Sequence, residues 1–192
     1  MYQDGAAARF QGENSLRNKL KEILLEKSVI SGREFKLASG KTSDFYVDAR
    51  VTTLWPEGAY LCGKIFLEML QDFKVDAVGG YSIGADPIVS AIAVLSFMDN
   101  KPIPAFIIRK EEKSHGTGKV IEGNFPAGGR VAIFDDVVTS GGSILRGAKQ
   151  VEAQGGTVEV IMGVIDREDG GREKIEAAGY KFLSIFTRKD LL

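Results

Sequence analysis

The chain has 192 residues, of which 44% are hydrophobic and 27% are charged, as is usual for a globular protein. This composition excludes a disordered, collagen-like or disulfide-stapled chain, and the length suits one substantial domain. The 25 Lys and Arg residues almost balance the 26 Asp and Glu residues, which leaves a net charge of -1. Proteins that bind nucleic acids or anionic membranes usually carry a basic excess. We therefore expect neither nucleic acid nor membrane as a partner.

The N-terminal region is predicted to contain a tail and then a helix. Residues 1–13 are Gly, Ala and polar residues without periodicity, so we expect a flexible tail before a single domain over residues 14–192. Leu16, Leu20 and Leu24 recur at helical spacing, which predicts a helix over residues 15–29.

Two further elements follow before the central part of the chain. Apolar residues mixed with a Ser-Gly turn predict a pair of short strands within residues 35–48. A second helix is predicted from Pro56 to about residue 73. The single cysteine, Cys62, lies among apolar positions of this helix, so we interpret it as a buried hydrophobe rather than a nucleophile.

Neither the cysteine content nor the apolar segments suggest export. One cysteine cannot form an internal disulfide, which fits a reducing compartment. The N-terminus lacks the apolar segment of a signal peptide, and the most apolar stretch, residues 89–98, is about half as long as a membrane span. We expect a cytoplasmic protein.

Short apolar runs alternate with helical stretches through the rest of the chain. Short buried strands that alternate with helices are typical of a parallel sheet with helices on both faces. The sequence therefore predicts one α/β domain. The runs are residues 77–78, 103–108, 131–134 and 158–165.

The most informative segment follows the run at 131–134. Asp135 and Asp136 stand where this strand is predicted to end, and ligands of open parallel sheets bind at that edge. Hydroxyl residues and two glycines over residues 139–143 then precede a predicted helix, an arrangement that can cradle a phosphate. Carboxylates repel phosphate but suit sugar hydroxyls or a water-bridged metal, so the segment indicates a ribose-phosphate site.

A simpler interpretation of this segment is a strand that ends in solvated acids. In that interpretation Thr139 or Ser140 caps the following helix. The paired acids together with three hydroxyls and two glycines favour the ligand site.

The segment resembles the phosphoribosyl-diphosphate motif of the type I phosphoribosyltransferases. The resemblance implies a parallel sheet under a small hood, and transfer of a 5-phosphoribosyl group to a nitrogenous base with Mg2+. Magnesium is then held mainly by the diphosphate, with water-mediated contact to the acids and no direct protein ligand. The residues that the motif assigns to substrate binding are Asp135, Asp136, Val137, Val138, Thr139, Ser140, Gly141, Gly142 and Ser143.

A second segment, residues 109–119, gathers four cations and the only histidine among glycines. Such a polar stretch predicts a surface loop. If the loop lies beside a ribose-phosphate site, its positive charges can stabilise a departing diphosphate. The spacing resembles the catalytic loop of the orotate-specific branch of the family, whose substrates are orotate and phosphoribosyl diphosphate. The resemblance implies substrate contacts by Arg109 and Lys110, and catalytic contacts by Lys113 and His115.

A third segment indicates which base is bound. Asp166-Arg167 resembles the segment whose arginine pairs with the carboxylate of orotate in that branch, and bidentate arginine geometry suits this anion. The resemblance also implies a homodimer in which loop 109–116 closes over the partner's site. A surface salt bridge is the simpler interpretation of Arg167.

Two other functions are compatible with parts of this sequence. A purine phosphoribosyltransferase would share the acid motif, but a neutral purine offers no carboxylate for Arg167. A non-catalytic, nucleotide-sensing regulator that binds RNA would need a basic face. The sequence departs from some family members at Ala38 and in the turn at residues 82–87, where those members place lysines, so we transfer no lysine role there.

Overall fold

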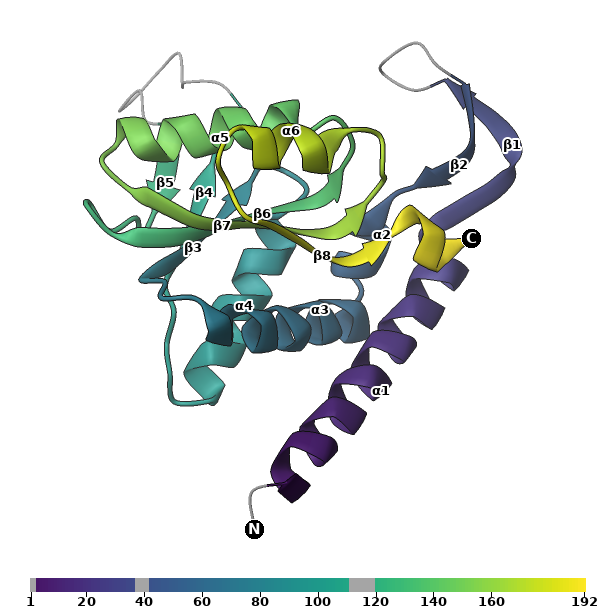
Figure 1. Ribbon diagram of the computed structural model, residues 1–192, viewed down its shortest axis with the longest axis horizontal. Helices are drawn as coiled ribbons and strands as arrows, with labels where there is room; N and C mark the ends of the chain where they lie inside the picture. The colour runs from purple at the N-terminus through teal and green to yellow at the C-terminus, as the bar shows by residue number, and fades with distance from the viewer. Residues whose placement is uncertain (1–2, 37–41, 111–119) are drawn as a thin grey trace.

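Figure 1 shows the computed structural model of the chain, which describes residues 3–36, 42–110 and 120–192. Helix α1 (Gln3–Lys27) begins twelve residues before the predicted start at Ser15. The alanines at positions 6–8 are strong helix formers, so the helix extends beyond the positions that have an apolar face. Leu20 and Leu24 of α1 are fully buried. The flexibility of residues 1–13 stays a prediction.

The predicted strand pair is present as a separate two-stranded sheet, the hood, but its first strand begins six residues before the predicted region 35–48. Strand β1 (Val29–Lys36) pairs antiparallel with β2 (Thr42–Val47), and the Phe35 ring stacks on Tyr46 with centroids 5.1 Å apart. β1 begins at Val29, which the periodicity assigned to the helix. Figure 1 shows the hood rising beside the main sheet.

Two helices and a short turn connect the hood to the main sheet. They are α2 (Ala49–Thr53), α3 (Pro56–Met69) and the 3-10 turn η1 (Leu70–Asp72), which confirms the helix predicted from Pro56 to about residue 73. Cys62 is completely buried on α3, and burial raises the pKa of its thiol to about 12. The thiol therefore stays protonated, as expected of a buried hydrophobe.

The main sheet has the strand order β5-β4-β3-β6-β7-β8, with every neighbouring pair parallel except β4 and β5. The four predicted runs are strands β3, β4, β6 and β7. The short edge strands β5 and β8 were not predicted. The bounds are β3 (Ala77–Tyr81), β4 (Ala105–Ile108), β5 (Ile121–Gly123), β6 (Arg130–Val138), β7 (Thr157–Asp166) and β8 (Phe182–Thr187).

Helices cover both faces of this sheet, which confirms the predicted fold class (Figure 1). α1, α3 and α4 (Asp86–Met98) pack on one face, where the ring of Phe66 meets that of Phe134 edge-on at 4.9 Å. α5 (Gly142–Ala153) and α6 (Gly171–Ala177) pack on the other, and the 3-10 turn η2 (Arg188–Leu191) ends the chain. None of the described helices has the length and apolarity needed to cross a bilayer.

Strand β6 is longer than predicted, and the difference shapes the site. Its pairing with β3 stops at Phe134, opposite Gly80, whereas its pairing with β7 continues to Val138, opposite Asp166. The predicted end at Phe134 was therefore wrong, because one neighbouring strand still supplies hydrogen bonds beyond it. Asp135 and Asp136 lie inside the strand, at the point where its β3 side becomes unpaired.

Candidate active site

A cleft of about 550 Å³ opens at the carboxyl ends of β3, β6 and β7, beneath the hood. We call it the main cleft. This is the edge of the sheet at which open α/β folds bind ligands. Eight of the residues predicted from the sequence meet in its walls: Lys110, Asp135, Asp136, Val137, Thr139, Ser140, Ser143 and Arg167.

The two acids of β6 are held close together in this cleft. The backbone N–H of Asp136 donates to Oδ1 of Asp135 at 3.1 Å, and the N–H of Val137 donates to Oδ1 of Asp136 at 2.9 Å. Burial, and then the negative charge of Asp136, raise the pKa of Asp135 well above its usual range. The pair therefore favours ligands that donate hydrogen bonds or bring positive charge.

The turn after β3 leaves room for Asp136. Gly84 lies against the Asp136 carboxylate, and a Cβ at position 84 would collide with it. The peptide bond between Ser82 and Ile83 in this turn is cis, and Ser82 Oγ donates to Asp86 at 2.9 Å. The turn thus brings backbone and a hydroxyl, rather than lysines, to the cleft.

A recess of about 90 Å³ adjoins the cleft at the start of α5, and we call it the phosphate recess. Gly141 has the left-handed φ of 69° there, and no side chain of the described residues caps α5. Thr139 and Ser140 therefore do not cap the helix as the simpler interpretation required. The N–H groups of the first turn and the positive end of the helix dipole face the recess. Of the predicted residues outside the cleft walls, Val138, Gly141 and Gly142 line the recess.

Arg167 presents a buried cation to the main cleft. Only 6% of its surface is exposed, and its Nε lies 3.4 Å from Oδ2 of Asp169. Its Nε and Nη2 are buried, and neither has a hydrogen-bond partner among the described residues. Buried guanidinium donors are normally paired, so the arrangement favours an anionic ligand over the simple surface salt bridge.

The cationic segment after β4 is only partly described. Lys110 lines the main cleft and also a second cleft of about 570 Å³ next to it. Arg109 lines only the second cleft, where its Nη1 donates to Oε1 of Glu122 at 3.0 Å. The structure therefore does not bring Arg109 to the main cleft of its own chain. Lys113 and His115 lie outside the described residues.

Arg50 of α2 is a cation of the main cleft that the sequence patterns did not predict. Its Nε and Nη2 donate to the two carboxylate oxygens of Asp48 at 2.8 and 2.9 Å. The acid also accepts from the Arg50 backbone N–H at 3.2 Å and so caps α2. The Asp-x-Arg spacing is the only sequence signal for this pair. It does not reveal that α2 lies beside the main cleft.

No protein-family profile matches the chain. The orotate phosphoribosyltransferase of Aquifex aeolicus is 46% identical over 178 residues, which cover 92% of this chain and 97% of the relative. The corresponding protein of a Nostoc species is 42% identical over 179 residues, 93% of this chain and 86% of the relative. The chain belongs to the orotate phosphoribosyltransferase family.

Solved structures agree with this assignment. The Mycobacterium tuberculosis orotate phosphoribosyltransferase in complex with 5-phospho-alpha-D-ribosyl 1-diphosphate is 34% identical and superposes with a TM-score of 0.78. The match covers 92% of this chain and 98% of that one. The orotate phosphoribosyltransferase fold thus extends over nearly the whole chain.

Proposed function

We propose that the main cleft and the phosphate recess form the active site for the family reaction. In it, the 5-phosphoribosyl group passes from phosphoribosyl diphosphate to orotate, giving orotidine 5'-monophosphate and diphosphate in pyrimidine biosynthesis. The observation that carries the assignment is the buried guanidinium of Arg167, whose Nε and Nη2 have no hydrogen-bond partner among the described residues, beside a phosphate recess and an acid pair.

The donor's sugar and 5-phosphate occupy the β6–α5 junction in this proposal. N–H groups and hydroxyls of residues 139–143 bind the 5-phosphate, which the helix dipole also attracts. Asp135 and Asp136 accept hydrogen bonds from the ribose hydroxyls. Their negative charge stabilises the positive charge that develops at the anomeric carbon when the diphosphate departs.

Arg167 binds the acceptor through the carboxylate of orotate. A guanidinium offers two parallel N–H donors to a carboxylate, and Arg167 has unused donors on Nε and Nη2. Thr139 lines the same cleft, and in this proposal it also contacts the base. The attacking nitrogen of orotate carries negative character once ionised, so no strong protein base is needed.

The leaving diphosphate is stabilised by cations of loop 109–116. Lys110 reaches the main cleft within its own chain, whereas Arg109 is directed to the neighbouring cleft. We propose that the protein is a homodimer in which Arg109, Lys113 and His115 serve the site of the partner subunit. A closed loop would also exclude water, which hydrolyses activated sugars.

Magnesium fits the residues present, although the chain by itself offers no complete metal site. Among the described residues, no three His, Cys, Asp or Glu side chains are grouped closely enough to hold a metal. Burial and the charge of Asp136 raise the pKa of Asp135, so an added cation would stabilise the ionised acid pair. Mg2+ usually binds through one or two carboxylates, waters and substrate phosphates. Asp135 and Asp136 would contact it through water, and the ion would neutralise diphosphate charge.

The test is diphosphate release from phosphoribosyl diphosphate with orotate, uracil, hypoxanthine and adenine offered separately. We expect release with orotate, because only orotate has a carboxylate for Arg167. Preferred use of hypoxanthine or adenine would favour the purine-transferring alternative. Ligand binding without turnover of any base would favour the regulator. A cytoplasmic location stays part of the proposal.

A further inference from the structure

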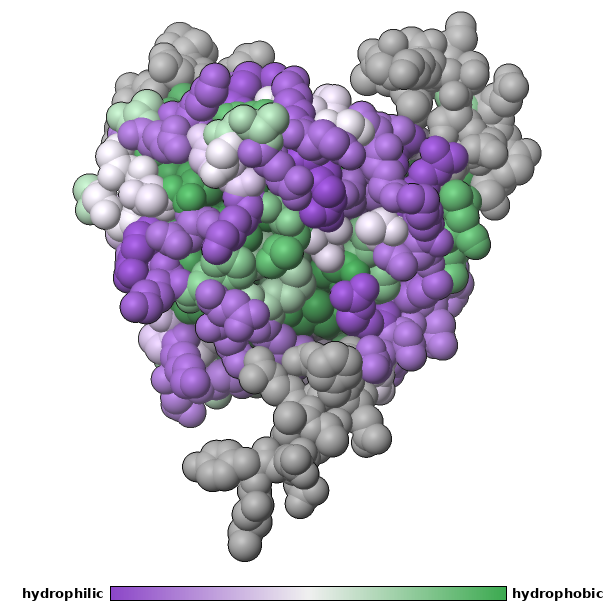
Figure 2. All heavy atoms as spheres, viewed as in Figure 1, coloured by the Kyte–Doolittle hydropathy of each residue, from purple (hydrophilic) through white to green (hydrophobic). Residues whose placement is uncertain are grey.

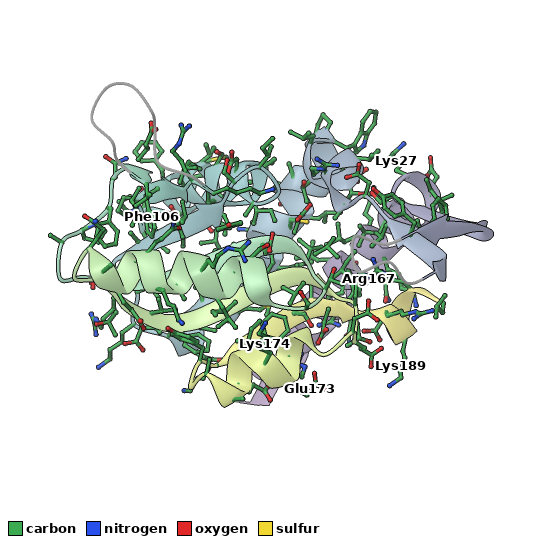
Figure 3. The ribbon with its side chains drawn as sticks, turned by 90° about the horizontal axis from the view of Figure 1, so that it is seen from above. Lys27, Phe106, Arg167, Glu173, Lys174 and Lys189 are labelled. Atoms are coloured by element: carbon green, nitrogen blue, oxygen red, sulfur yellow. The ribbon has the colours of Figure 1, made fainter. Side chains whose placement is uncertain are left out.

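Two cationic side chains lie beside the phosphate recess and have no assigned role in the proposed reaction. They are Arg146 of α5 and Lys174 of α6, and both are exposed. A Cβ added at Gly142 would lie 3.8 Å from each of three polar atoms, namely Arg146 Nη1, Lys174 Nζ and Ser140 Oγ. Figure 3 labels Lys174 at the edge of α6 next to α5. The three groups therefore converge on the first turn of α5.

Arg146 and Lys174 bring positive charge to the first turn of α5. Neither side chain forms an ion pair with a carboxylate in the part of the chain that the structure describes. Both nitrogens lie 3.8 Å from the same Cβ position, so the distance between them is at most 2 × 3.8 Å. This distance is shorter than the screening length of about 8 Å at physiological ionic strength. The positive end of the α5 dipole adds to the same region. Three sources of positive potential thus meet, and an anion there would relieve their repulsion.

A hydrogen bond connects Arg146 to the recess itself. Its Nη2 donates to Oγ of Ser143 at 3.3 Å, and Ser143 lines both the recess and the main cleft. Because the hydroxyl oxygen accepts from Arg146, its proton remains available for another acceptor. A phosphate oxygen in the recess is such an acceptor.

We propose that Arg146 and Lys174 are positioning residues for the 5-phosphate of donor and product. Arg146 acts through the hydroxyl of Ser143, and Lys174 acts by its charge. The inference rests on the proposed function and deepens it. A phosphate monoester carries close to two negative charges at neutral pH, which two cations match.

The experiment measures binding of orotidine 5'-monophosphate by calorimetry, together with the KM for orotate at saturating donor. The variants are Arg146→Ala, Lys174→Ala, the double variant and Lys149→Ala. Lys149 is an exposed cation of α5, so Lys149→Ala changes the net charge by the same amount as Arg146→Ala or Lys174→Ala. We expect the double variant to bind the nucleotide about tenfold more weakly, with a shallower salt dependence. Lys149→Ala and the KM for orotate should stay within twofold of wild type.

The outcomes separate this inference from the proposed function. Wild-type nucleotide affinity in the double variant would overturn the inference alone, as would equal weakening by Lys149→Ala. A wild-type protein that fails to bind orotidine 5'-monophosphate would overturn the proposed function, and this inference with it. Arg146→Lys keeps the charge without the planar fork, so its affinity should lie between wild type and Arg146→Ala.

Discussion

The backbone N–H of Arg167 donates to the carbonyl oxygen of Val138, 3.0 Å away. Val138 is the last residue of β6, and its register partner Asp166 is the last residue of β7. Arg167, which is assigned to the base, and Thr139, which lines the phosphate recess, therefore each follow directly after one of two paired strand ends. The spacing between the two subsites is set by the β6–β7 ladder, which is more rigid than a loop.

The acid pair should be needed for turnover but not for folding. Asp135→Asn and Asp136→Asn should each lower kcat by about 10²-fold, because each removes negative charge beside the developing positive charge. Circular dichroism should show an intact fold. Asp72→Asn, at an exposed acid in η1, is the matched control and should leave kcat unchanged. Wild-type turnover in both site variants would show that these acids do not serve the sugar.

The raised pKa of Asp135 has a consequence for stability. Its pKa in the folded state is higher than in the unfolded state, so the folded state binds more protons. Its contribution to stability is therefore present at low pH and is lost as the pH rises through the folded pKa. Asp135→Asn should raise the melting temperature at neutral pH by a few degrees and flatten its dependence on pH above about 4. A variant that melts below wild type at pH 7 would contradict this.

The left-handed glycine at the start of α5 should be irreplaceable. Gly141 has φ of 69°, and a Cβ there would lie 2.9 Å from the carbonyl oxygen of Gly171. Gly141→Ala should destabilise the protein by about 2 kcal/mol and raise the KM for phosphoribosyl diphosphate.

Gly170 provides the matched control for this change. It has φ of 86°, but a Cβ there would meet nothing within 4 Å. Gly170→Ala should therefore cost only the backbone strain, about 1 kcal/mol, and leave that KM unchanged. Equal effects of both variants in chemical denaturation and in KM would mean that the recess tolerates a side chain.

Loop sharing in the proposed homodimer can be tested by mixing two inactive variants. One carries Lys113→Ala and the other carries Asp136→Asn. If the loop serves the partner, each mixed dimer has one site with both parts intact. Random pairing of equal amounts makes about half the dimers mixed, so roughly a quarter of wild-type sites should return.

The control for this experiment is proof of subunit exchange, by co-purification of an untagged variant with a tagged one. If each loop serves its own subunit, every site carries one lesion. No activity would then return despite exchange, and the shared site would be excluded.

Local sequence patterns predicted most of the fold and the centre of the site. Residues 131–143 combine a strand, an acid pair and a glycine turn within one continuous segment. The order of these residues was therefore enough to indicate a ribose-phosphate site. The strand ends were less predictable, because β6 continues past Phe134 only through its pairing with β7. Strand β5 has three residues, too few for a periodic signal.

Long-range contacts account for the remaining differences. The pairing of Arg109 with Glu122 follows from the antiparallel return of β5 along β4, which no local pattern specifies. Arg50 reaches the main cleft because α2 packs beside β6, and Asp48 then holds its guanidinium in place. Such positions depend on the tertiary structure rather than on neighbouring residues.

The most direct test of the account is the kinetic effect of Arg167→Ala. We predict that kcat/KM for orotate falls by about 10²-fold, because a charge-assisted pair with the carboxylate is lost. The KM for phosphoribosyl diphosphate should change much less. Arg130→Ala is the control, since Arg130 is a partly exposed arginine at the opposite end of β6 that pairs with Asp76 and does not line the cleft. Selective loss for orotate in Arg167→Ala alone is the predicted result, whereas equal loss for both substrates would contradict the central claim that Arg167 recognises the base.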